Sequence, residues 1–161
     1  MTFYSGKDPR HVPLYSYAEA SRYLRVPAST LRRWARRLGI GPTGRGEPSL
    51  SLANLVSLVC HMENSGYDHS DELICEFTSA TGPDGLPSTV DIWLYGYDER
   101  YISLNPRVAF GQPTVGSTGI KTAVIAQRYQ AGEPVELLSV DYEILLDEVW
   151  AALVFEGVKQ A

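Results

Sequence analysis

The sequence predicts a mainly α-helical protein with small β-hairpins, made of an N-terminal head and a C-terminal domain. Three observations support this. Apolar residues recur at helical spacing, Gly- and Pro-rich segments separate the helical stretches, and charge is distributed unevenly between the two ends. A chain of 161 residues has room for one ordinary domain or two small ones.

The first helix is predicted to begin at Ser16, because Ser16 and Glu19 have the spacing of a capping box. Apolar residues follow on one face, namely Tyr17, Ala20, Tyr23 and Leu24. Since Pro27 would remove a backbone hydrogen bond inside a helix, residues 24–27 are predicted to form a short turn. A second helix then starts at Ala28 or Ser29 and ends before Gly39.

The second helix has two unlike faces over residues 29–38. Its inward face is predicted to carry Leu31, Trp34, Ala35 and Leu38, and its four arginines share the outward face. Neighbouring arginines repel one another in an isolated helix, so a polyanion is the natural partner. The second helix after a short turn is the element that enters the major groove of DNA. The predicted DNA-binding residues are Ser29, Thr30, Arg32, Arg33, Arg36, Arg37 and Arg45, with Ser29, Arg32, Arg33 and Arg36 towards the groove and Arg37 and Arg45 against phosphate.

The charge distribution supports this division. Residues 1–46 hold nine Lys and Arg against two acidic residues, a net charge of +7, whereas the remainder holds five against seventeen, a net charge of −12. A basic head on an acidic body is typical of a protein that contacts phosphate at one end and another partner elsewhere.

Residues 17–34 resemble the opening of the winged helix-turn-helix heads of the MerR type. That family usually caps and starts its recognition helix with a Ser-Pro pair, and here Pro27 and Ala28 stand at those positions, without a side-chain cap. The resemblance implies that the loop of residues 39–46 is the wing and lies beside the DNA backbone.

The middle of the chain is predicted to complete the head. Residues 50–62 have helical spacing, with Ser51 as a cap and Gly66 as the break, and residues 71–78 look like a short helix begun by Ser70. The Gly- and Pro-rich residues 81–88 are predicted to be a linker. The expected domains are therefore residues 1–80 and 89–161.

The C-terminal domain is predicted to be a β-hairpin followed by three helices. Residues 89–95 and 101–104 are rich in β-branched and aromatic residues and flank a turn at 96–100. The helices are expected at residues 122–131, 134–140 and 147–155, with Gly132 ending the first and Gly157 the third.

Residues 102–155 resemble the small helical family catalogued as domain of unknown function 433. The resemblance is carried by residues 105–120 (NPRVAFGQPTVGSTGI), Ala131-Gly132-Glu133 and Asp141-Tyr142. This family recurs in antitoxins paired with PIN-domain ribonuclease toxins. With a MerR-like head, the whole chain resembles the larger VapB-like antitoxins, although its residues 50–100 are shorter than that architecture leads us to expect.

The leading hypothesis is a homodimeric type II antitoxin that binds operator DNA, represses its own operon and neutralises a PIN-domain ribonuclease. An acidic body would be attracted to the basic RNA-binding rim of such a toxin. Two alternatives stay open: a MerR-like transcription regulator with a small-effector-binding C-terminal domain, and a protein-interaction module without DNA binding.

Other signals are weaker, and we expect no enzyme, metal or cofactor. Residues 39–44 match G-x-G-x-x-G but follow a helix rather than a strand. The spacing of Cys60, His61, His69 and Cys75 matches no standard zinc site, and both cysteines are expected to be buried small hydrophobes. Without a long apolar run or a signal peptide, the chain is expected to be cytoplasmic and to avoid membranes.

Overall fold

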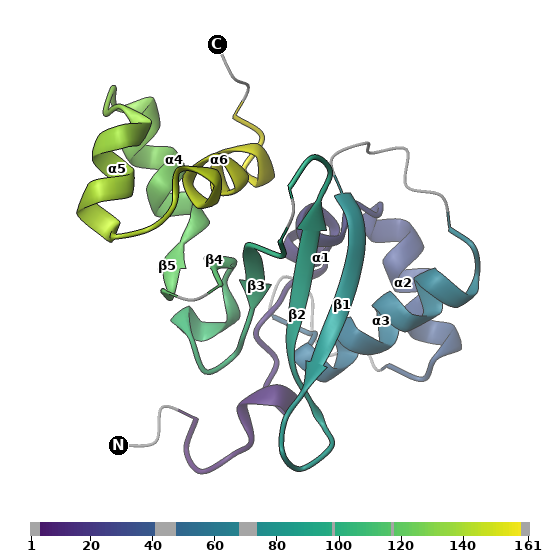
Figure 1. Ribbon diagram of the computed structural model, residues 1–161. Helices are drawn as coiled ribbons and strands as arrows, with labels where there is room; N and C mark the ends of the chain where they lie inside the picture. Colours follow the sequence, from purple (N-terminus) through teal and green to yellow (C-terminus); the bar gives the residue numbers. More distant parts are fainter. Residues whose placement is uncertain (1–3, 41–47, 68–73, 98, 117, 159–161) are drawn as a thin grey trace. The chain divides into compact units, whose positions relative to one another are not determined.

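A computed structural model describes residues 4–40, 48–67, 74–97, 99–116 and 118–158 (Figure 1). The chain divides into two compact units. The N-terminal unit comprises Met1–Asp71 and Ser79–Val90, and the C-terminal unit comprises Glu72–Thr78 and Asp91–Ala161. None of the helices in the described ranges is long and apolar enough to cross a bilayer.

The helices of the N-terminal unit follow the prediction. They are the short 3-10 helix η1 (Pro9–His11) and the α-helices α1 (Tyr17–Leu24), α2 (Ala28–Arg37) and α3 (Leu52–Asn64). A capping box between Ser51 and Asn54 starts α3, and Gly66, at φ 66°, follows its end. An isolated antiparallel bridge joins Tyr15 to Leu50. The largest fully buried side chains here are Tyr15, Leu24, Leu31, Leu50, Leu52, Leu55 and Leu58.

A β-hairpin occupies the segment where a helix and a linker were predicted. Strand β1 (Ile74–Thr81) and strand β2 (Pro87–Leu94) are neighbours in the sheet, and the Gly82 amide donates to the Leu86 carbonyl at 2.8 Å in the turn. The prediction of a helix at 71–78 is therefore wrong from residue 74 onward, and residues 81–88, predicted to be a linker, comprise the hairpin turn at 82–86 and the strand residues on either side of it. Pairing with a strand further along the chain decided the conformation, which local spacing does not reveal.

The hairpin also changes the division of the chain. Its turn half, residues 79–90, belongs to the N-terminal unit, whereas residues 72–78 and the part of β2 from residue 91 belong to the C-terminal unit. The boundary thus passes through paired strands instead of a separate connecting segment.

The fold is mixed α/β rather than mainly α. Strands β3 (Ile102–Leu104), β4 (Thr114–Val115) and β5 (Ile120–Lys121) complete a five-stranded sheet in the order β1-β2-β3-β4-β5. The pairs β3–β4 and β4–β5 are antiparallel, with Ile102 opposite Val115 and Thr114 opposite Lys121. The predicted pairing of residues 89–95 with 101–104 is confirmed by the neighbouring positions of β2 and β3.

The three predicted C-terminal helices are present as α4 (Thr122–Gln130), α5 (Val135–Tyr142) and α6 (Leu146–Phe155). Gly132 and Gly157 lie just beyond α4 and α6 at positive φ, as predicted for residues that end helices. The short 3-10 helix η2 (Ala109–Gly111) lies between β3 and β4. The core includes Ile102, Leu104, Val115, Ile125, Leu138, Val149 and Leu153.

Two polar contacts fix the helices of the C-terminal unit. The buried Thr122 hydroxyl donates to the Glu156 carboxylate at 2.5 Å, which ties the start of α4 to the residue after α6. Arg128 near the end of α4 pairs with Glu133 and, at 2.7 Å, with Asp141 on α5. Since a buried polar group is costly unless it is paired, the Thr122 contact constrains how α4 and α6 pack, whereas the Arg128 ion pairs are partly exposed to solvent.

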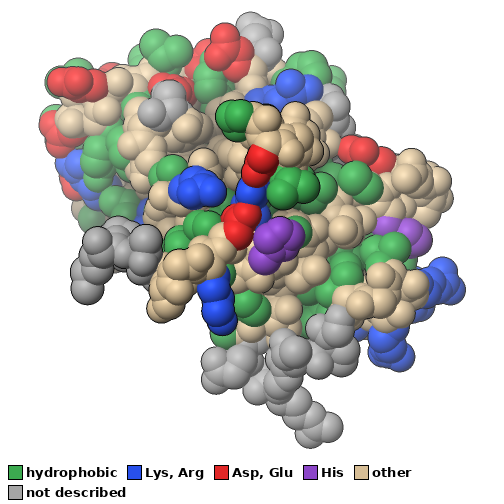
Figure 2. All heavy atoms as spheres, turned by 90° about the horizontal axis from the view of Figure 1, so that it is seen from below, with side chains coloured by type: hydrophobic (Ala, Val, Ile, Leu, Met, Phe, Trp, Pro, Cys, Tyr) green, Lys and Arg blue, Asp and Glu red, His purple; other side chains and the backbone are tan. Residues whose placement is uncertain are grey.

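In the N-terminal unit, Arg10 of η1 is held between two carboxylates. It is only 8% exposed, contacts Asp8, and binds Asp84 of the β1–β2 turn through two hydrogen bonds of 3.0 and 2.6 Å. The space-filling view of Figure 2 shows acidic side chains beside a basic one on the face seen from below. These ion pairs hold the pKa of both carboxyls well below its usual range, mainly through the Arg10 hydrogen bonds.

Candidate nucleic-acid interface

The segment predicted to be a helix-turn-helix begins with a capped α1 and a tight turn. The Ser16 hydroxyl accepts a hydrogen bond from the Glu19 amide at 3.1 Å, which satisfies a free donor at the start of α1. Arg25 ends α1 in the left-handed conformation, at φ 56°, and its side chain bonds the Arg22 carbonyl at 2.7 Å. Pro27 then precedes α2, as the sequence predicts. Together these residues form the short turn between the two helices.

Helix α2 is anchored to α3 through Trp34. The indole of Trp34 makes edge-on contacts with the rings of His61, at 5.2 Å, and Tyr67, at 5.3 Å between ring centroids. On the same face, Leu31 is fully buried and Ala35 is 1% exposed. The predicted inward face of α2 is therefore confirmed for these three residues.

The predicted inward position of Leu38 is wrong, because its side chain is 42% exposed. Leu38 follows the last residue of α2, and the chain reverses directly after it at Gly39, at φ 71°. The Gly39 amide bonds the Arg36 carbonyl and the Ile40 amide bonds the Ala35 carbonyl, as in a Schellman motif. The prediction assumed that the helix continues through residue 38, whereas α2 has already ended at Arg37.

The opposite face of α2 is basic and open to solvent. Arg32, Arg33, Arg36 and Arg37 are all exposed, Ser29 is exposed, and Thr30 is half-buried. Arg45 and most of the predicted wing of residues 39–46 lie outside the described residues, which leave out 41–47. Six of the seven predicted DNA-binding residues therefore lie on one short helix, with its apolar anchors on the other side.

Tyr17 of α1 is part of this surface, although the sequence placed it on the inward face. The Arg32 guanidinium lies over the Tyr17 ring, 5.1 Å from its centroid. Burial raises the pKa of the half-buried Tyr17 hydroxyl, and the charges of Arg32 and Arg36 oppose that rise. A tyrosine in the first turn of α1 thus supports one arginine of α2. The sequence signal for this role is an aromatic residue in the helix that precedes an arginine-rich one.

The start of α2 leaves backbone donors available. Pro27 supplies no side-chain cap, and its carbonyl accepts from the amides of Thr30 and Leu31, at 3.0 and 3.1 Å. Within the described residues, no acceptor is bonded to the amides of Ala28 and Ser29. Free amides at a helix N-terminus are suited to an anion, because they add to the positive end of the helix dipole.

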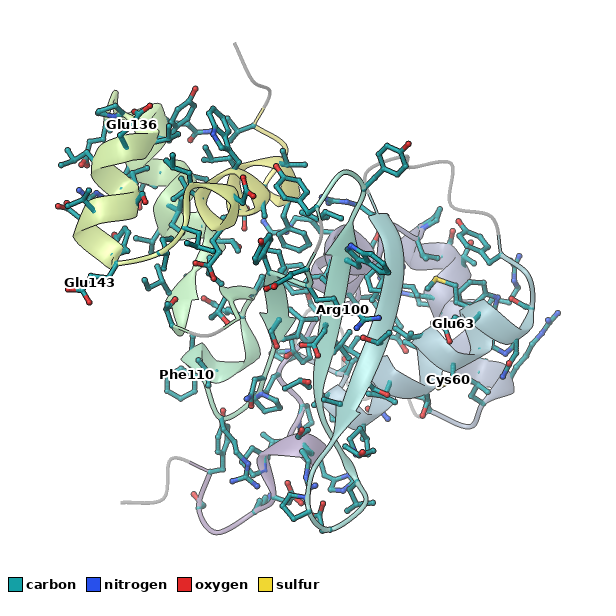
Figure 3. All side chains as sticks on the ribbon, viewed as in Figure 1. Cys60, Glu63, Arg100, Phe110, Glu136 and Glu143 are labelled. Atoms are coloured by element: carbon teal, nitrogen blue, oxygen red, sulfur yellow. The ribbon has the colours of Figure 1, made fainter. Side chains whose placement is uncertain are left out.

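The cysteine and histidine residues of the head do not gather into a metal site in the part of the chain that the structure describes. His61 is engaged with Trp34, and His69 lies outside the described residues. Cys60 is exposed on α3 (Figure 3), which corrects the expectation that it is buried. The apolar spacing of α3 places residues 55, 58, 59 and 62 inward, so position 60 falls on the outer face.

Comparison with known proteins supports the C-terminal resemblance. Residues 102–155 match a family described as protein of unknown function, DUF433. That segment begins at β3 and ends with α6. No curated protein sequence matches the chain.

The whole fold has a solved counterpart. The X-ray crystal structure of Rv2018 from Mycobacterium tuberculosis matches with a TM-score of 0.70 and 22% sequence identity. The match covers 88% of this chain and 97% of that one. The likeness therefore extends well beyond the 54 residues of the DUF433 segment, and at this identity it concerns the fold alone.

Proposed function

We propose that this protein binds double-stranded DNA by inserting α2 into the major groove. The observation that carries the proposal is the basic face of α2, where Arg32, Arg33, Arg36 and Arg37 are exposed opposite the buried Leu31, Trp34 and Ala35. Such a helix offers bidentate donors for guanine O6 and N7 on one side and a rigid attachment on the other.

The surroundings of α2 favour the same use. The Tyr17 ring supports the Arg32 guanidinium, so less side-chain freedom is lost when this arginine binds a base. The free amides of Ala28 and Ser29 suit a backbone phosphate at the entry of the helix into the groove. We propose that Ser29, Arg32, Arg33 and Arg36 face the bases.

The test is binding of the full chain to DNA from upstream of its own gene, followed by fluorescence anisotropy. We expect a double Arg32→Ala, Arg33→Ala variant to lose about 1–3 kcal/mol for each arginine that reads a base. The matched control is Arg107→Ala, which removes an exposed arginine from the C-terminal unit and should bind like the parent. Equal affinity of the double variant and the parent would contradict the role of α2.

We further propose that the protein acts as a homodimeric antitoxin that represses its own operon and neutralises a PIN-domain ribonuclease. The DUF433 match at residues 102–155 and the net charge of −12 over residues 47–161 favour this role over a small-effector-binding regulator. Co-expression with the product of the adjacent reading frame tests it. If that product is not toxic, or remains toxic in the presence of this protein, the antitoxin role is refuted.

A further inference from the structure

Helix α5, the turn that follows it and the first residue of α6 expose large apolar side chains. Four side chains are involved, which we call the α5 corner, with exposed fractions of 42% for Leu137, 74% for Val140, 63% for Leu145 and 44% for Leu146. Single exposed apolar residues are common on proteins, but a contiguous group marks an interaction surface.

The backbone brings these side chains to one corner. Leu137 and Val140 are three residues apart and so share a face of α5. After α5, Glu143 adopts a left-handed conformation at φ 55° and the chain folds back. Two hydrogen bonds then join Ser139 to Ile144, one from the Ile144 amide at 3.1 Å and one from the Ser139 hydroxyl at 2.6 Å. Val140 and Leu145 are the chain neighbours of these two bonded residues, so the turn brings their positions to the same end of α5.

Helix α5 is apolar on both sides. Its inward face is already filled by Val135, 8% exposed, and the fully buried Leu138, so Leu137 and Val140 are not needed for the core. Apolar residues on a second face of a helix, beyond those that its own core needs, indicate that this face can also be covered. Its outer face is therefore suited to a further protein surface.

Within the described residues, the unpaired charged side chains of α5 and of the turn after it are acidic, and Arg128 of α4, which contacts α5, is paired with Glu133 and Asp141. Residues 129–158 contain seven acidic side chains and no Lys or Arg. Glu136 and Glu143 lie at the two ends of α5 (Figure 3), are exposed, and form no ion pair within the described residues. Asp141 is different, because Arg128 neutralises it.

The acidic side chains indicate which kind of protein could bind to the α5 corner. A second copy of the same corner would bring Glu136 and Glu143 close to their own counterparts, and like charges across an interface are unfavourable. A partner with an apolar centre and a rim of Lys and Arg would bury the four side chains and satisfy the carboxylates. A nuclease carries such a basic rim, because it binds RNA.

We propose that the α5 corner is the docking surface for the basic nuclease partner. This inference rests on the proposed antitoxin function and names the part of the chain that performs it. Leu137, Val140, Leu145 and Leu146 form the centre of the interface, and Glu136 and Glu143 lie at its edge.

The experiment uses the full chain and the purified product of the adjacent reading frame. We expect Leu137→Asn, Val140→Asn to weaken binding at least about tenfold, because truncating central apolar contacts is costly. Glu136→Gln, Glu143→Gln should slow association by about threefold or more at low salt and have little effect at high salt. The matched controls are Leu86→Asn, at 44% exposure in the N-terminal unit, and Glu63→Gln on the exposed side of α3. Both controls should bind like the parent.

The outcomes separate the two proposals. If the parent itself does not bind the product, the antitoxin function is overturned and this inference with it. If the parent binds and both double variants bind equally well, only the α5 corner is refuted. Circular dichroism confirms that the variants are folded, and light scattering reports their mass in solution. A lower mass for Leu137→Asn, Val140→Asn than for the parent would show that the corner joins copies of this chain, which would also overturn the inference.

Discussion

Replacing Trp34 by Ala should both destabilise the N-terminal unit and weaken DNA binding. Trp34 is 5% exposed and contacts two rings, those of His61 and Tyr67, from its position on α2. Removing a buried tryptophan leaves a large cavity and costs about 3–5 kcal/mol. The two edge-on ring contacts supply about 0.5–1.5 kcal/mol each of that loss. Because a domain of this size is stable by only about 5–15 kcal/mol, α2 should become markedly less ordered.

The assay is hydrogen exchange of the amides in α2 and α3, which reports this unit separately from the C-terminal one. Trp34→Ala should lower amide protection there by the full 3–5 kcal/mol range, about 10²–10³-fold or more. Trp34→Phe keeps one ring and should lose about 1–2 kcal/mol. Arg37→Ala, on the exposed side of the same helix, should change protection by less than about 0.5 kcal/mol. A loss below about 1 kcal/mol for Trp34→Ala would refute the anchoring of α2 through this side chain.

Three further perturbations follow from single contacts. Tyr17→Leu removes the ring under Arg32 and should weaken DNA binding by about 0.5–1 kcal/mol, measured by anisotropy on the upstream DNA. In the parent, hydrogen bonds from Arg10 lower the pKa of the Asp84 carboxyl from 3.8 to about 2, and Asp84→Asn removes this ion pair. The carboxylate therefore stabilises the fold above pH 3.8, and the deficit of Asp84→Asn in urea unfolding should shrink as the pH falls towards about 2. Thr122→Val removes a buried hydroxyl bonded to the carboxylate after α6 and should cost about 1–3 kcal/mol in thermal unfolding.

Each of these has an outcome that would contradict it. Tyr17→Phe keeps the ring and should bind DNA like the parent; if it is as weak as Tyr17→Leu, the hydroxyl rather than the ring is responsible. If the deficit of Asp84→Asn in urea unfolding is the same at pH 2 as at pH 5, the charge of the Asp84 carboxylate is not its cause. Thr122→Ser retains the hydroxyl, and a loss as large as that of Thr122→Val would point to packing instead of the hydrogen bond.

The parts of the fold that could be predicted are those that short-range patterns determine. Pro27 and Gly39 bound α2, and the cap Ser51 and the break Gly66 bound α3, at the places that the sequence indicated. The outward arginines of α2 were predictable for the same reason, since helical periodicity is a local property. The three C-terminal helices likewise begin and end within a few residues of their predicted bounds.

What could not be predicted depends on partners far along the chain. Strand β1 exists because β2 pairs with it, and eight residues such as Ile74–Thr81 do not by themselves distinguish a short helix from a strand. The turn at residues 82–86 has the composition of a linker because both need Gly and Pro. The contact between Tyr17 and Arg32 depends on how two helices pack, which no pattern within one helix contains.

The α5 corner could not be predicted from the sequence, because its exposure also depends on how the helices pack. Periodicity treats every apolar residue at helical spacing as part of the core of its own chain, and α5 carries apolar residues on two faces. Only burial separates Leu138, which the chain itself covers, from Val140, which it leaves 74% exposed. Leu38 and Val140 are both apolar residues that helical spacing predicts to be buried and that are exposed. Leu38 lies beyond the end of its helix, whereas Val140 lies within a helix whose core face is already filled by other side chains. An exposed apolar residue of the second kind cannot be accounted for by this chain alone, and it therefore points to a partner.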